Sequence, residues 1–213
     1  MAIPVLHGPN YSTYTRSVRL ALIEKGVEYT LREIDLLGGA TLHEAFLSLS
    51  PFGKVPVLQH GALTIYETAA INRYVDEAFD GPALQPSDPV ARARMNQIIG
   101  VADAYAYRTL IGDIVMQRIV LPALKRRPNA QVLRKAAPDM RRVLLALEAL
   151  AAGTPFLTGS SPTLADLHLA PIFGFFAETP EGRRVLPTLP RLSLWWPRMA
   201  ERESIRATVP RLS

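Results

Sequence analysis

Side-chain hydroxyls are concentrated in one short run of the sequence, from Tyr11 to Thr15, between an apolar segment and a helical pattern. A hydroxyl that donates a hydrogen bond to an anion stabilises the charged form and lowers the pKa of the parent acid. The start of a helix adds positive potential, because its first N–H groups have no partner within the helix. This run is therefore the leading candidate for stabilising a negatively charged reactant.

The chain contains no cysteine among its 213 residues. This excludes disulfides, thiolate metal ligands and a cysteine nucleophile, so any thiol chemistry must use a thiol that another molecule supplies. The four histidines do not fall at the spacing of a metal site, and we expect no metal: they are His7, His43, His60 and His168.

The formal net charge of +5 is spread along the chain. The densest basic run, Lys125 to Arg127, lies beside Pro128 and is typical of a solvated helix end, so no nucleic-acid partner is expected. No apolar run reaches the length of a membrane span, and the first residues lack the features of a signal peptide. We therefore expect a cytoplasmic protein that does not bind membranes.

The first eighty residues alternate between strand and helix patterns. Strands are expected at residues 3–6, 28–34, 57–58 and 63–66, and helices at residues 16–25, at 41–49 and from residue 68. Gly26 stands where a glycine ends a helix, and Thr41 and Glu44 have the spacing of a capping box. The order is βαβαββα, which predicts an α/β domain with a parallel first pair of strands.

Turn-forming residues at 81–88 predict a linker between a domain at 1–80 and a domain at 89–213. Asp88 can cap a helix whose first residue is Pro89. Every later pattern is helical, at residues 89–120, 129–152 with a kink at Pro138, 164–178 and 190–202. The second domain is therefore expected to be all-α.

Four motifs, in this order along the chain, resemble those of the glutathione transferase superfamily. They are Gly53-Lys54-Val55-Pro56-Val57-Leu58, Glu67-Thr68-Ala69-Ala70-Ile71-Asn72-Arg73-Tyr74, Ser161-Pro162-Thr163-Leu164-Ala165-Asp166, and Leu189-Pro190 with Trp195. The resemblance implies a thioredoxin-like N-terminal domain that binds glutathione and an all-helical C-terminal domain. It also implies an enzyme that conjugates the glutathione thiolate to electrophilic, mostly apolar small molecules, with glutathione as co-substrate and no further cofactor.

The same resemblance assigns glutathione-binding roles. The backbone of Val55 would pair with the cysteinyl part of glutathione by strand addition, next to a cis Pro56. Glu67 and Thr68, at a helix start, would hold the γ-glutamyl carboxylate and ammonium groups. Thr68 stands where the family has a serine. Lys54 and His43 are assigned to the glycyl carboxylate.

Counting back from Arg16 and Val18, Ser12 matches the catalytic serine of the phi- and zeta-like classes. Tyr11, Thr13 and Tyr14 remain alternative hydroxyl donors. Zeta-like members usually have a cysteine two positions after this serine, where this chain has Tyr14, which argues against maleylacetoacetate isomerase as the activity.

The second, apolar substrate is assigned to a pocket that includes Tyr14, Tyr105 and Met116. Tyr105 and Tyr107 are two positions apart and cannot share one helix face, so one of them is expected in packing. Asp166 is expected to cap its helix with Thr163. The resemblance also implies a homodimer. Alternative functions are a glutathione-dependent isomerase, peroxidase or disulfide reductase, or a noncatalytic interaction module.

Overall fold

The computed structural model describes residues 2–36 and 38–210 and divides into two compact units. The first unit comprises Met1–Gln85 together with Arg202–Ser213, and the second is Pro86–Glu201. The change of unit therefore falls within the expected linker. The segment from Arg202 differs from the expected boundary, because it groups with the N-terminal unit rather than with the helical one.

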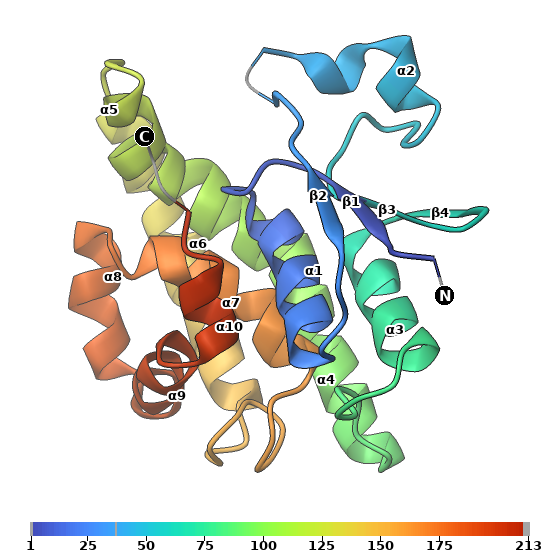
Figure 1. Ribbon diagram of the computed structural model, residues 1–213. Helices are drawn as coiled ribbons and strands as arrows, with labels where there is room; N and C mark the ends of the chain where they lie inside the picture. The colour runs from blue at the N-terminus through green and yellow to red at the C-terminus, as the bar shows by residue number, and fades with distance from the viewer. Residues whose placement is uncertain (1, 37, 211–213) are drawn as a thin grey trace. The chain divides into compact units, whose positions relative to one another are not determined.

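The first unit is built on a four-stranded sheet with the order β2-β1-β3-β4 (Figure 1). Its strands are β1 (Val5–His7), β2 (Thr30–Arg32), β3 (Val57–His60) and β4 (Leu63–Tyr66). The β1 and β2 strands are parallel, as the βαβ pattern predicts, and the other pairs are antiparallel. Leu6 pairs with Leu58 across β1 and β3, and both side chains are buried in the core.

Helices cover both sides of this sheet. The helical elements of the first unit are α1 (Thr13–Glu24), η1 (Ala40–Leu42), α2 (Glu44–Leu47), α3 (Thr68–Ala78) and α10 (Glu203–Ala207). Helices α1 and α3 pack against each other, and α2 lies on the far side of the strands from them (Figure 1). The apolar positions Val18, Ala21 and Leu22 of α1 are buried, and Gly26 follows the helix with a φ of 70°. A glycine adopts this left-handed conformation without steric cost.

The capping box expected between Thr41 and Glu44 is wrong. Thr41 lies inside the 3₁₀ turn η1, where it is buried, and His43 is the N-cap of α2 without a side-chain hydrogen bond. The left-handed Gly39 (φ 80°) precedes η1, so the chain forms a turn where the sequence spacing indicated the start of a longer helix.

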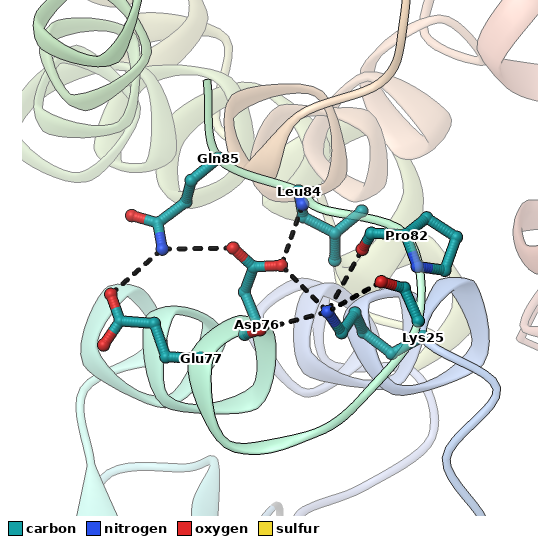
Figure 2. Close-up of polar contacts among 7 residues, drawn as sticks. Lys25, Asp76, Glu77, Pro82, Leu84 and Gln85 are labelled. Atoms are coloured by element: carbon teal, nitrogen blue, oxygen red, sulfur yellow. Dashed lines mark hydrogen bonds and ion pairs between the residues drawn. The ribbon is translucent and has the colours of Figure 1, made fainter. Parts of the chain in front are cut away.

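A buried lysine joins the end of α1 to α3 and to residues 81–85 (Figure 2). Lys25 Nζ donates to the Asp76 side chain at 3.2 Å, to the Asp76 backbone carbonyl at 3.0 Å and to the Pro82 carbonyl at 3.1 Å. Asp76 in turn accepts from the Leu84 N–H at 2.8 Å and from the Gln85 side chain at 3.1 Å. Because of these bonds, the first part of the expected linker is fixed to the first unit.

The C-terminal segment joins the first unit through Glu24, at the end of α1. Arg202 holds the Glu24 carboxylate with two hydrogen bonds, of 2.9 and 2.5 Å, and the Ser204 hydroxyl donates to it at 2.5 Å. Arg202 is also the N-cap of α10, which contacts α1. These contacts explain why the chain returns to the first unit at Arg202.

Within residues 86–201, the regular elements of the second unit are all helical, apart from an isolated β-bridge. Its elements are α4 (Pro89–Val101), η2 (Ala102–Val120), α5 (Leu121–Ala123), α6 (Ala130–Leu150), α7 (Leu164–Phe176), α8 (Pro180–Val185), η3 (Leu186–Thr188) and α9 (Pro190–Ala200). Asp88 caps α4 by accepting from the Ala91 N–H at 2.7 Å, with Pro89 at the first helical position, as the sequence predicts. The chain stays helical through η2, which has π-type hydrogen bonding, and on into α5.

Helix α7 forms the centre of the second unit. Its side chains are almost all buried, and Phe173 packs edge-on against Trp195 of α9 with ring centroids 5.1 Å apart. The expected capping box is confirmed, since Asp166 accepts from the Thr163 N–H at 2.7 Å and from its hydroxyl at 2.9 Å. Asp166 also accepts from the Leu157 N–H and from the Trp195 indole N–H, which the sequence motif alone does not reveal.

Candidate active site

Ser12 is the N-cap residue of α1. Its extended backbone ends the loop after β1, and its Oγ accepts a hydrogen bond from the Thr15 N–H at 3.3 Å. This bond uses a lone pair of Ser12 Oγ and leaves the hydroxyl hydrogen able to donate. The side chain is half-buried at the positive end of a 12-residue helix. Ser12 is therefore placed to donate a hydrogen bond to an anion in a region of positive potential.

The neighbouring hydroxyls have less suitable surroundings. Burial raises the pKa of the Tyr11 phenol, and the negative charges of Asp35 and Glu33 raise it further. An anion bound beside Tyr11 would meet the same repulsion. Thr13 and Thr15 are buried, and the Thr15 side chain is packed against the backbone of Gly8.

The Val55–Pro56 peptide bond is cis and directly precedes β3. Pro56 is buried and Val55 is half-buried. Among the hydrogen bonds between described residues, none involves the backbone N–H or C=O of Val55. Both groups therefore remain able to pair with the extended backbone of a peptide ligand.

The turn from β4 into α3 is made by Glu67. Its φ of 72° lies in the left-handed region, which a residue with a side chain rarely adopts. The carboxylate of Glu67 makes no capping bond to α3, and the next residue, Thr68, is buried at the first helical position. The first backbone bond of the helix is donated by Ile71 N–H to the Glu67 carbonyl, so the preceding amides stand at an open helix start. This end of α3 can bind a carboxylate.

Strand register brings these three motifs to one edge of the sheet. His7 at the end of β1 pairs with Val57 at the start of β3, and Val57 pairs with Tyr66 at the end of β4. Ser12 follows β1 in the chain, Pro56 directly precedes β3, and Glu67 directly follows β4. The three motifs, although far apart in sequence, are therefore connected to the same end of the sheet, at the row of paired residues His7, Val57 and Tyr66.

Lys54 and His43 are both exposed and lie between η1 and β3. The backbone N–H of Lys54 donates to Ser50 Oγ at 3.3 Å, while His43 begins α2. The side chains of both residues are accessible to an anionic ligand, and their assignment to the glycyl carboxylate stays a prediction.

The residues assigned to the second substrate lie in different units. Tyr14 is half-buried on α1, whereas Tyr105 and Met116 are on η2 with 61% and 36% of their surfaces exposed. Tyr107 is half-buried, and burial raises the pKa of its phenol. Tyr105 and Tyr107 thus differ in exposure, as their spacing on one helix predicts.

Arg16 has no role assigned by the sequence motifs, although it lies in α1, the helix that Ser12 caps. It lies one helical turn after Ser12, and its N–H donates to the Ser12 carbonyl at 2.8 Å. Burial lowers the pKa of the guanidinium to about 10, with a smaller contribution from the charge of Arg19, so Arg16 is still a cation at neutral pH. Its Nε has no hydrogen-bond partner within the described part of the chain. The four-residue spacing from Ser12 was the sequence signal that could have identified it.

The sheet, its helices and the gathered motifs define a thioredoxin-like domain followed by a helical domain, the architecture of the glutathione transferases. Two family models agree: "Glutathione S-transferase, N-terminal domain" matches residues 11–78, and "Glutathione S-transferase, C-terminal domain" matches residues 111–203. Among characterised relatives, Glutathione S-transferase 3 of Zea mays is 30% identical over 211 residues, which cover 98% of this chain and 94% of the relative.

Solved structures give the same result. The structure of glutathione S-transferase III in its apo form has a TM-score of 0.85 and 30% identity, over 97% of this chain and 95% of that chain. Glutathione S-transferase I from mais, in complex with an atrazine glutathione conjugate, has a TM-score of 0.82 and 27% identity, over 97% and 96% of the two chains. The chain belongs to the glutathione S-transferase family.

Two further features are absent from the part of the chain that the structure describes. The described residues contain no helix long and apolar enough to cross a membrane. They also contain no group of three or more histidine, cysteine, aspartate or glutamate residues placed to hold a metal ion.

Proposed function

We infer that this chain is a glutathione transferase that joins the sulfur of glutathione to electrophilic small molecules, with Ser12 as the hydroxyl that stabilises the thiolate. The observation that carries the inference is the row of paired residues His7, Val57 and Tyr66 at one end of the sheet. The motifs assigned to glutathione are next to this row in the chain: Ser12, Val55–Pro56 and Glu67–Thr68. A tripeptide bound along this edge would have its thiol and its two ends recognised by different motifs.

We propose the following recognition of glutathione. The free backbone groups of Val55 pair with the cysteinyl residue, the open start of α3 at Thr68 holds the γ-glutamyl carboxylate, and Glu67 accepts from the ligand ammonium group. Lys54 and His43 act at the glycyl carboxylate. The buried Thr68 hydroxyl retains the donor that a serine would offer at this position.

The chemistry follows from the pKa of a thiol, which is near ~8.5 in an unperturbed cysteine. The Ser12 hydroxyl and the N-terminus of α1 stabilise the thiolate, so the proton is released to water at neutral pH. The sulfur then forms a bond to the electrophilic atom of the second substrate. Its electron pair displaces a leaving group or adds to a polarised double bond.

We further propose that Tyr14, Tyr105 and Met116 contact the second substrate, that the protein acts in the cytoplasm, and that it is a homodimer. The exposed apolar surfaces of Tyr105 and Met116 support the first of these proposals. Light scattering at micromolar concentration measures the mass of the assembly, and a mass of one chain would contradict the dimer.

The catalytic proposal is tested with Ser12→Ala and with Tyr11→Phe as the matched control. We expect Ser12→Ala to bind glutathione within a few-fold of the parent but to lose about 10²-fold in conjugation rate near pH 7, with part of the loss recovered at pH 9. Tyr11→Phe should stay within about twofold, because its hydroxyl lies beside two carboxylates. Calorimetry with glutathione and conjugation assays across pH measure both. A full rate in Ser12→Ala would exclude Ser12 as the stabilising group.

A further inference from the structure

Helices α1 and α3 pack against each other and begin at the same end of the sheet, because each follows a strand that ends in one row of paired residues (Figure 1). The start of α1 carries the Ser12 hydroxyl, and the start of α3 carries the open amides beside Thr68. In the proposed function, these two helix starts bind the thiolate and the γ-glutamyl carboxylate of one tripeptide. The distance between them must therefore match the ligand.

One buried hydrogen bond joins the two helices directly. Asn72 Nδ2 of α3 donates to Ser17 Oγ of α1 at 2.9 Å, and the two residues are 1% and 0% exposed. Asn72 lies four residues after Thr68, and Ser17 lies five residues after Ser12. At a rise of about 1.5 Å per residue, the bond crosses roughly 6 Å from the start of α3 and roughly 7.5 Å from the start of α1. It therefore fixes the position of one helix start relative to the other.

Asn72 is unfavourable for stability at this position. Its Oδ1 is buried and has no hydrogen-bond partner among the described residues, and such an atom costs free energy. Its neighbours on α3, Ile71 and Val75, are apolar and completely buried, so the surroundings suit an apolar side chain. The sequence motifs assign no role to Asn72. A buried residue that lowers stability in this way indicates a role other than stability.

The other contacts between the two helices restrict their relative position less closely. Apolar packing is non-directional. Near the far ends of the helices, Lys25 Nζ forms an ion pair with Asp76 at 3.2 Å (Figure 2). The flexible four-carbon stem of the lysine lets this pair follow a small shift. The side chains of Asn72 and Ser17 are short, so their hydrogen bond tolerates less movement.

We propose that Asn72 is a positioning residue of the glutathione site. Its hydrogen bond to Ser17 sets the position of α3 along α1, and thereby the separation between the hydroxyl that stabilises the thiolate and the amides that bind the γ-glutamyl carboxylate. This role rests on the proposed function, because it requires both helix starts to bind one glutathione. After a displacement of about 1 Å, the ligand reaches either helix start but not both in the best geometry.

The test compares two variants with the parent chain. Ser17→Ala combined with Asn72→Leu replaces both polar partners with apolar groups, so its stability in urea should equal or exceed that of the parent. Ser17→Ala alone leaves the Asn72 amide buried without a partner, so its stability should fall. Despite this difference, both variants should lose about tenfold in conjugation rate at pH 7, and the pKa of the bound glutathione thiol should rise by about one unit.

A glutathione analogue with a methyl group in place of the thiol distinguishes positioning from local damage to α3. This analogue has no thiolate to place at Ser12, so its binding does not depend on the separation of the two helix starts. Its affinity, measured by calorimetry, should stay within about twofold of the parent value in both variants. The affinity for glutathione at pH 7 should fall about fivefold, because the thiolate contact is lost.

Tyr74→Phe is the matched control. It removes a hydrogen bond of 2.7 Å from the same helix, but this bond is to His60 of β3 rather than to α1. The conjugation rate of this variant should stay within about twofold, and the pKa of the bound thiol should not change.

An unchanged rate and thiol pKa in both variants, or an equal loss of affinity for glutathione and for the analogue, would overturn the positioning role and leave the transferase function in place. If the double variant does not fold, the same measurements on Ser17→Ala decide. A parent chain that neither binds nor conjugates glutathione would overturn both the positioning role and the proposed function.

Discussion

Tyr11 and Ser12 are adjacent hydroxyls with opposite electrostatic surroundings. Tyr11 has two carboxylates near it, whereas Ser12 caps a helix and has the cation Arg16 one turn further along. The difference in charge, rather than the number of hydroxyls, favours the proposal that Ser12 stabilises the thiolate. The sequence offers four candidate hydroxyls, those of Tyr11, Ser12, Thr13 and Tyr14, and the three-dimensional positions of Asp35, Glu33 and Arg16 add an electrostatic distinction between Tyr11 and Ser12.

Arg16 should contribute to the acidity of the bound thiol. Replacing it with glutamine removes a buried positive charge near the helix start, so the pKa of bound glutathione should rise by about one unit. The pH dependence of kcat/KM measures this shift. Arg19→Gln, on the same helix but bonded to Tyr29, is the control and should leave the profile unchanged. If both variants have the profile of the parent, Arg16 has only a packing role.

At the scale of elements, the capping residues show which local signals are reliable. Asp88 with Pro89 and Thr163 with Asp166 were recognised from spacing, because each satisfies its own helix. Thr41 with Glu44 has an equally good spacing, yet it forms no cap, because the chain turns at Gly39 and buries Thr41. Tertiary packing decides which of several possible caps is used.

Asp166 should be far more important for stability than an ordinary cap. It is fully buried and accepts from two backbone amides, a hydroxyl and an indole. Asp166→Asn replaces one acceptor oxygen with a donor, so we expect the free energy of unfolding to fall by about 2–3 kcal/mol. Urea denaturation measures this. The exposed Asp139→Asn on α6 serves as the control, and a similar loss in both variants would contradict the argument.

Much of the fold was therefore predictable from local patterns. The βαβ pattern, the hairpin, the helical second half and the three motifs that are assigned to glutathione all depend on neighbours in sequence. The left-handed Glu67 and the bonds of Lys25 to residues 81–82 do not, because each depends on groups brought together by folding. Ser12 is indicated by the family resemblance alone, and its place at the start of α1 supports the proposal.

At the scale of the whole molecule, the first unit is made of two segments that are distant in sequence. Glu24 and Arg202 are 178 positions apart, yet they form the ion pair that attaches α10 to α1. Lys25, the next residue, holds residues 81–82. The end of α1 thus secures both segments of the first unit.

The Glu24 contacts should make stability depend on pH. Burial raises the pKa of Glu24, but the hydrogen bonds from Arg202 and Ser204 and the charge of Arg202 outweigh it, so the pKa lies below its ordinary value of 4.5. A lowered pKa in the folded state stabilises the protein above pH 4.5, and this contribution is lost as the pH falls through the folded-state pKa.

Glu24→Gln should therefore reduce the free energy of unfolding by about 1–2 kcal/mol at pH 7 and by less under acidic conditions. Thermal or urea unfolding at pH 7 and below pH 4.5 measures the difference. A cycle with Arg202→Gln isolates the pair itself. An equal loss at both pH values would show that the carboxylate charge is not involved.

The attachment of Arg202 to Glu24 also has a consequence for biosynthesis. At the usual rates of translation, the 178 positions between the two residues correspond to roughly 9 to 36 seconds of elongation. During this time the ribosome presents an N-terminal domain whose carboxylate at position 24 has no partner, while the inserted helical domain is still being made. We expect the N-terminal domain to become resistant to protease on stalled nascent chains only when a linker added after Ser213 is long enough to carry Arg202 out of the exit tunnel.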